Sequence, residues 1–189
     1  MQLAAAALGA TDWAEFKSAE VARAAAYIMT GAEGGALHRP RLIEQYEDFG
    51  PASRSRLVAG GLIPATWVIQ AQRVRRHAYA QAMDLFDRFD LLIAAAAPAV
   101  APKVGQETLL INGRSIPTKA GLGVLTQPIS CIGLPVCTVP VWPGEGDSAA
   151  ERALPVGVQL IAAPWREGLC LAAARTLEQA GIAAVRARD

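Results

Sequence analysis

The chain has 189 residues, of which 52% are hydrophobic and 19% are charged, and its formal net charge is +1. This composition excludes a disordered chain, because it supplies enough apolar surface for a core. The balanced charge, with arginines scattered along the chain, argues against a nucleic-acid partner. We expect one domain over residues 1–189.

Cysteine usage and apolar runs indicate the compartment. The three cysteines are an odd number without CxxC spacing, which is typical of neither a disulfide framework nor a zinc site. We expect them to be reduced packing residues in a cytoplasmic protein without metal or cofactor. The apolar residues 1–10 lack cationic residues, so they suggest the end of a helix rather than a signal peptide. No apolar run reaches the ~18 residues of a membrane span, so no membrane contact is expected.

The first half of the chain is predicted to be helical. Asp12 is a candidate N-cap that forms a capping box with Glu15, and the following helix is predicted to end at Gly34 and Gly35. Residues 38–46 suggest a short helix, and Pro51 suggests the first position of another. A long helix is predicted over residues 64–89, with one buried face at intervals of three and four: Trp67, Ala71, Val74, Ala78, Ala82, Leu85 and Phe89.

The second half favours strands, and the whole pattern therefore predicts an α/β fold. Residues 90–94 are predicted to form a buried strand. Residues 103–128 are predicted to be loop-rich, with a hairpin turn at Asn112 and Gly113. Residues 134–142 and 154–162 are predicted strands that pair antiparallel across a polar connection at 143–153. Residues 166–180 are predicted to form an amphipathic helix that stops at Gly181.

The residues alone predict no catalytic residue. No serine lies in a GxSxG elbow, and HExxH, P-loop and GxGxxG motifs are absent. His38 and His77 have no Ser or Cys partner in a known pattern. Arg73 could hold a carboxylate with its planar fork, or it could lie solvated on the surface of the long helix.

Five runs of residues resemble the amidase signature family, in family order. TQPISCIGLPVCTVP at residues 126–140 resembles its T-x-P-x-N-x-x-G-x-P-x-x-S-x-P segment, and LPVGVQLI at 154–161 resembles its GLPVGVQLIG strand. TQPISCIGLPV and IAAPWRE resemble the carboxybiuret-hydrolase type of amidase, and broader relatives include the amidase component of glutamyl-tRNA amidotransferase. The remaining runs resemble the end of a helix, the long helix leading into a strand, and the start of the last helix: residues 32–38, 71–98 and 164–170.

The resemblance implies a fold and an activity. The fold is the C-terminal part of the amidase signature fold, a mixed sheet flanked by helices and incomplete here. The activity is hydrolysis of a small amide, such as a urea-like one, through a serine acyl-enzyme. The family's two serines and lysine lie in a Gly-Ser-rich segment to which nothing in this chain corresponds. We therefore expect a C-terminal portion of an amidase domain without catalytic residues, inactive alone and poorly soluble without an N-terminal amidase chain.

The same resemblance implies substrate-binding residues. The segment before the GLPV strand approaches the substrate in the family, which gives Gln127, Ser130, Cys131 and Ile132 as pocket residues. The amide of Gln127 can both donate to and accept from a urea-like group. Alternatively, Gln127 satisfies only backbone groups of its loop.

Two other functions stay open. The chain could be a non-catalytic interaction subunit that docks onto a separate amidase core, or onto a small helical subunit like those that accompany amidotransferases. It could also be an independent hydrolase in which His38 or His77 activates a serine. Hydrolysis by the purified chain that is lost on replacing a histidine would indicate the latter.

Overall fold

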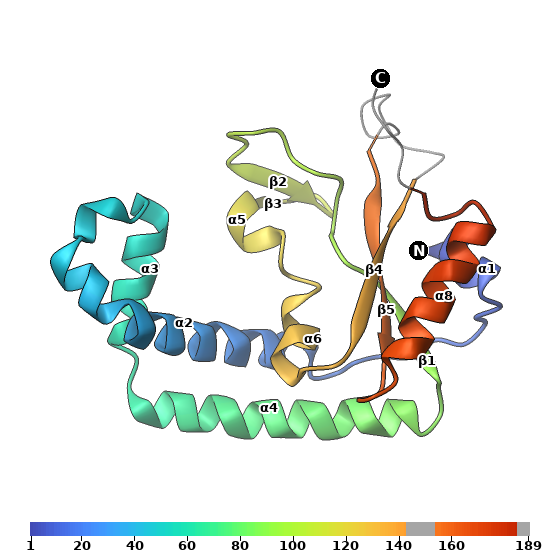
Figure 1. Ribbon diagram of the computed structural model, residues 1–189, viewed down its shortest axis with the longest axis horizontal. Helices are drawn as coiled ribbons and strands as arrows, with labels where there is room; N and C mark the ends of the chain where they lie inside the picture. The colour runs from blue at the N-terminus through green and yellow to red at the C-terminus, as the bar shows by residue number, and fades with distance from the viewer. Residues whose placement is uncertain (143–153, 185–189) are drawn as a thin grey trace. The chain divides into compact units, whose positions relative to one another are not determined.

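The computed structural model describes residues 1–142 and 154–184 and divides the chain into two compact units (Figure 1). The first unit comprises Met1–Glu15, Ala82–Thr126 and Gly133–Asp189. The second comprises Phe16–Gln81 and Gln127–Ile132. The single amidase domain expected over residues 1–189 stays a prediction. The polar connection predicted at 143–153 lies outside the described residues.

The first unit contains a three-stranded antiparallel sheet. Its strands are β1 (Leu91–Ala95), β5 (Val156–Ala162) and β4 (Val136–Val141), in the order β1-β5-β4. The predicted antiparallel pairing of the last two strands is confirmed. Residues 158–162 of the central strand β5 are all buried, whereas β1 is half-buried along its whole length. The strand predicted at 90–94 is therefore confirmed in place but not in burial, because it lies at an edge of the sheet.

Helix α8 (Glu167–Gln179) covers one face of this sheet, next to α1 (Gln2–Ala7) (Figure 1). Alternate residues of a strand share a face, so Val139 on β4 and its cross-strand partner Val158 on β5 point toward the same core. The predicted stop of α8 is confirmed, since Gly181 has a φ of 68°. The core of the unit comprises Ala4, Val139, Val141, Val158, Leu160, Ala174, Leu177 and Ala183.

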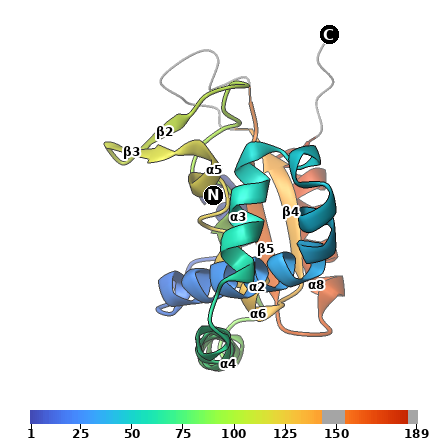
Figure 2. The same ribbon diagram turned by 90° about the vertical axis from the view of Figure 1, so that its left-hand side faces the viewer.

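The predicted hairpin is confirmed. Strands β2 (Thr108–Ile111) and β3 (Arg114–Pro117) pair antiparallel. Asn112 and Gly113 between them have φ values of 50° and 74°. Two left-handed residues in succession fit a type I′ turn, which suits the twist of a hairpin. The short helix α5 (Thr118–Gly121) follows and packs against both strands (Figure 2).

The second unit begins with a helix that is longer than predicted. Helix α2 (Ala19–Glu44) runs through Gly34 and Gly35 and takes in most of the short helix predicted at 38–46. The capping box of Asp12 and Glu15 is wrong, because the N-cap is Ser18. The prediction for Pro51 is confirmed, since it opens α3 (Pro51–Gly61).

The glycines that were predicted to end α2 instead allow α3 to approach it. A Cβ atom on Gly35 would lie 2.2 Å from the backbone nitrogen of Gly61. A Cβ atom on Gly60 would lie 2.0 Å from the carbonyl oxygen of Gly31. No side chain fits at such distances, so the two helices are in direct backbone contact at these positions. This packing gain explains why the helix continues despite the low helix propensity of glycine.

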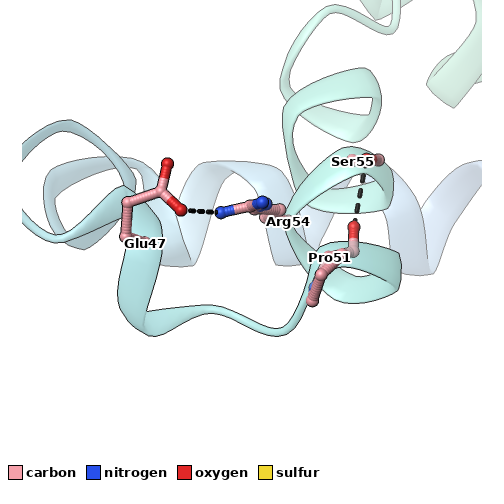
Figure 3. Close-up of polar contacts among 4 residues, drawn as sticks. All are labelled: Glu47, Pro51, Arg54 and Ser55. Atoms are coloured by element: carbon pink, nitrogen blue, oxygen red, sulfur yellow. Dashed lines mark hydrogen bonds and ion pairs between the residues drawn. The ribbon is translucent and has the colours of Figure 1, made fainter.

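Polar contacts join α3 to the single-turn helix η1 (Tyr46–Asp48) that precedes it (Figure 3). The guanidinium of Arg54 forms an ion pair with Glu47 and lies 4.9 Å from the ring centroid of Tyr46. Within α3 itself, the hydroxyl of Ser55 donates a hydrogen bond of 3.1 Å to the carbonyl oxygen of Pro51. The ion pair is exposed on the Glu47 side, so its contribution to stability is small.

Helix α4 (Ala65–Phe86) confirms the long helix predicted over 64–89. Ala71, Ala78 and Ala82 on the predicted face are buried, whereas Trp67 at the start of the face is 59% exposed. Among the described residues, no helix is both long and apolar enough to cross a bilayer.

Candidate functional site

All four predicted substrate-binding residues lie on one short helix, α6 (Gln127–Ile132), which packs against α2 within the second unit. The sequence predicted a loop up to residue 128, so this helix was missed. Pro128 stands in its first turn, where the lack of an N–H group costs nothing. Gly133 follows with a φ of 72°, a conformation that suits glycine at a helix end.

Gln127 is held by a charged donor. Its side-chain oxygen Oε1 accepts a hydrogen bond of 2.9 Å from Nε of Arg23 on α2. The partner is a side chain 104 positions away, so Gln127 does more than satisfy backbone groups of its own segment. Sequence reasoning missed Arg23 because no local pattern connects it to α6. A hydrogen bond from a guanidinium is stronger than one between neutral groups, and it orients the amide.

The other three residues differ in exposure. Ser130 is exposed, whereas Cys131 and Ile132 are buried. Burial raises the pKa of the Cys131 thiol, and the positive charge of Arg75 opposes part of that rise. The thiol of Cys131 is therefore protonated near neutral pH, which is unsuited to a nucleophile.

Neither histidine forms a catalytic pair with a serine in the described part of the chain. The buried Ser18 donates a hydrogen bond of 2.6 Å to Oε1 of Gln81, whose Nε2 lies 3.3 Å from Nε2 of His77. An amide cannot accept the proton of a nucleophilic hydroxyl as a base would, so this chain of contacts is structural. The ring of His38 packs edge-on against Phe49 with 5.8 Å between centroids.

The remaining candidates do not form a binding or metal site among the described residues. Arg73 is exposed on α4. Within residues 1–142 and 154–184, no three His, Cys, Asp or Glu side chains are grouped so as to hold a metal ion.

In the described part of the chain, each of the two units has a pocket of its own. The first has a volume of about 440 Å³ and lies where β4 begins and α8 begins, with Cys137, Trp165 and Cys170 in its lining. The second has a volume of about 360 Å³ and is lined by apolar atoms of α2 and α4, including Ile28 and Trp67. None of the four predicted residues on α6 lines either pocket.

Comparison with known proteins identifies the family. Residues 43–171 match the family model described as Amidase. The chain belongs to the amidase family. The predicted fold class, an α/β chain corresponding to part of an amidase fold, is confirmed by solved structures of amidases that match this chain over part of their length.

The relatives are much longer than this chain. AtzE of Pseudomonas sp. (strain ADP), a component of 1-carboxybiuret hydrolase, is 44% identical over 183 residues, which are 97% of this chain and 39% of that protein. The amidase component of the glutamyl-tRNA(Gln) amidotransferase of Lachnoclostridium phytofermentans is 33% identical over 143 residues, 72% of this chain and 28% of that protein. The predicted resemblance to both kinds of relative is confirmed.

Solved structures agree with this picture. An inhibitor-bound structure, described as an unexpected vestigial protein complex that reveals the evolutionary origins of an s-triazine catabolic enzyme, superimposes with a TM-score of 0.92 and 43% identity. The match covers 98% of this chain and 40% of that chain. A structure described as an amidase superimposes with a TM-score of 0.72 and 25% identity over 87% of this chain. This chain thus spans about two fifths of the first of these structures.

Proposed function

We propose that this chain is the C-terminal part of an amidase and contributes one wall of its substrate pocket. Hydrolysis would proceed through a serine acyl-enzyme, with two serines and a lysine supplied by an amidase segment other than residues 1–189. The observation that carries the proposal is the 44% identity to a component of 1-carboxybiuret hydrolase over 97% of this chain. The substrate class that follows is a small, urea-like amide.

On this proposal, α6 binds the substrate and does not react with it. Gln127 and Ser130 are three positions apart and lie on one side of the helix. Because Arg23 holds Oε1 of Gln127, the amide nitrogen of Gln127 is oriented as a donor, and the exposed hydroxyl of Ser130 can donate or accept. A carbonyl and an amino group of a urea-like amide match these two groups. The buried Cys131 and Ile132 support this face from behind.

The proposal places the reacting groups elsewhere. A serine becomes nucleophilic only beside a base, and its tetrahedral intermediate needs donors for the oxyanion. The described serine contacts include no such base, as the Ser18–Gln81 bond illustrates. The chain alone is therefore expected to bind weakly and to release no product.

A chimera tests this proposal. AtzE would receive residues 1–189 in place of its own matching region, and ammonia release from biuret-type amides would be measured. We expect activity in the chimera and none in the isolated chain. Gln127→Ala should lower kcat/KM about 3- to 10-fold, the range expected for one hydrogen bond. Gln72→Ala, at an exposed position of α4, is the matched control and should change nothing.

Two results would refute the proposal. One is a folded chimera without amide hydrolysis, and the other is hydrolysis by the isolated chain. An equal loss in Gln72→Ala and Gln127→Ala would refute the role of α6 in particular.

A second candidate function is a non-catalytic subunit that docks onto a separate amidase core or onto a small helical subunit. It is favoured by the sheet, because in the described residues β1 and β4 are edge strands, and an edge strand offers unpaired backbone groups to another chain. Trp13 and Trp165 in the same unit are 78% and 90% exposed. Stable co-purification with an amidase core whose turnover does not depend on Gln127 would favour this function over the first.

A further inference from the structure

Two cysteines line one pocket where α8 packs on the sheet. Cys137 lies on β4 and shares its face of the strand with Val139 and Val141, which pack into the core beneath α8. Cys170 lies in the first turns of α8 and is 2% exposed. Both side chains line the same pocket of about 440 Å³. The strand β4 and the helix α8 therefore each contribute one thiol to the same pocket.

The backbone holds the Cys170 sulfur next to the strand. Its Sγ donates to the carbonyl oxygen of Pro135 at 3.6 Å. The backbone N–H group of Ala162 donates to the same carbonyl oxygen of Pro135 at 3.1 Å, which ties this end of β4 to β5 beside the sulfur. Burial raises the pKa of the Cys170 thiol, so Cys170 attacks slowly near neutral pH and faster as the pH rises and its thiolate forms. Cys137 is only half-buried in the open pocket, so it is the thiol that reagents meet first.

We propose that Cys137 is a site of oxidation by hydroperoxides and low-molecular-weight disulfides, and that Cys170 is its resolving thiol. With a hydroperoxide, the Cys137 thiol is oxidised to a sulfenic acid and the peroxide is reduced to water or an alcohol. The Cys170 thiol loses its proton and its sulfur attacks the sulfenic sulfur; a disulfide bond forms, and that proton and the sulfenic hydroxyl leave as water. With glutathione disulfide, Cys137 forms a mixed disulfide and releases one glutathione, and Cys170 displaces the second.

This disulfide would join β4 to α8 across a loop of more than thirty residues. Closing a loop of that length restricts the unfolded chain and stabilises the fold if the native geometry is unstrained. Thiols such as dithiothreitol would reverse the reaction. The cysteine pair would thus form a reversible cross-link between the edge strand β4 and helix α8.

The experiment uses the full chain, reduced and then treated with glutathione disulfide or hydrogen peroxide. Intact mass should show the loss of two hydrogen atoms without dimer formation. Trypsin should then release residues 120–152 joined to residues 167–175. Because Cys131 is in the same tryptic peptide as Cys137, Cys131→Ala is the matched control and should keep the cross-link. The oxidised chain should also melt several degrees above the reduced chain.

Two variants separate the roles of the thiols. Cys170→Ser should retain one glutathione on Cys137, because nothing displaces it, whereas Cys137→Ser should retain none at Cys170. If wild-type chain keeps all thiols reduced, or if Cys137→Ser forms the same cross-linked peptides, the proposal is wrong. If a serine variant fails to fold, the peptide maps of the wild-type chain and of Cys131→Ala still show whether Cys137 and Cys170 are cross-linked.

Discussion

The contact between α2 and α3 makes a sharp prediction about Gly60. A Cβ atom there would lie 2.0 Å from the carbonyl oxygen of Gly31 and 2.6 Å from its carbonyl carbon. Both are backbone atoms inside α2, so they cannot move without displacing the helix. Alanine in place of glycine favours a helix by up to about 1 kcal/mol, whereas overpacking costs about 1–3 kcal/mol and more where backbone must shift. The steric term is larger, and Gly60→Ala should lower the free energy of unfolding by about 2 kcal/mol.

Urea unfolding followed by circular dichroism measures this loss. With a slope of roughly 2 kcal/mol per molar urea, the midpoint should fall by about 1 M. The neighbouring Gly61 is the matched control, because its Cβ would lie 4.0 Å from the nearest atoms of Gly35. Gly61→Ala should therefore leave the midpoint almost unchanged. Equal midpoints for wild type and Gly60→Ala would refute the direct backbone contact between α2 and α3.

Three further predictions concern the first unit and the thiols. Leu177→Ala in α8 removes a fully buried side chain and should cost about 2–5 kcal/mol in thermal or urea unfolding. Gln159→Leu should cost about 1–3 kcal/mol by the same measurement, because Nε2 of Gln159 donates to the carbonyl oxygens of Ala95 and Leu125 at 2.9 and 3.3 Å. Burial raises the pKa of Cys131 and Cys170 in the folded chain. The folded state then holds these protons more tightly, so stability is complete below the ordinary thiol pKa of ~8.5 and falls as pH rises above it. Replacing both thiols by alanine should flatten that alkaline decline in unfolding free energy.

Elements with strong local signals were predicted well. The hairpin at Asn112 and Gly113 follows from two residues that tolerate positive φ, and both adopt it. Helix α4 follows from a long apolar stripe, and β5 from a run of β-branched and apolar residues. In each case the preference of the residues and the packing of the fold agree, so the sequence suffices.

The sequence-based predictions fail where contacts between residues far apart in the chain determine the local structure. Gly34 and Gly35 suggest a helix end, yet α3 packs directly on this part of α2 and the helix continues. Asp12 suggests an N-cap, but α2 begins after Ser18, whose hydroxyl bonds to Gln81, 63 positions away. The local sequence around these residues contains no information on either long-range contact. Helix α6 was missed because six residues are too few to show a helical period.

The candidate site shows the same division. Its four residues came from the resemblance to a family, since nothing in their local pattern marks Gln127 or Ser130 as binding residues. Arg23 was missed because its contact with Gln127 spans 104 positions. The structure adds what a motif cannot give, namely that Ser130 is exposed while Cys131 and Ile132 are buried on the same short helix.

In the second unit, different parts of helix α2 contribute to stability and to the proposed substrate binding. Its first turns hold α6 through the bond from Arg23 to Gln127, and its later turns pack on α3 through Gly31 and Gly35. A steric change at Gly60 acts on the later turns, two helical turns or more from Arg23. Gly60→Ala should therefore lower the unfolding free energy yet leave kcat/KM of the folded chimera unchanged. A variant that lost both in proportion would show that α2 transmits the strain along its length, and that the orientation of Gln127 depends on the packing of α3.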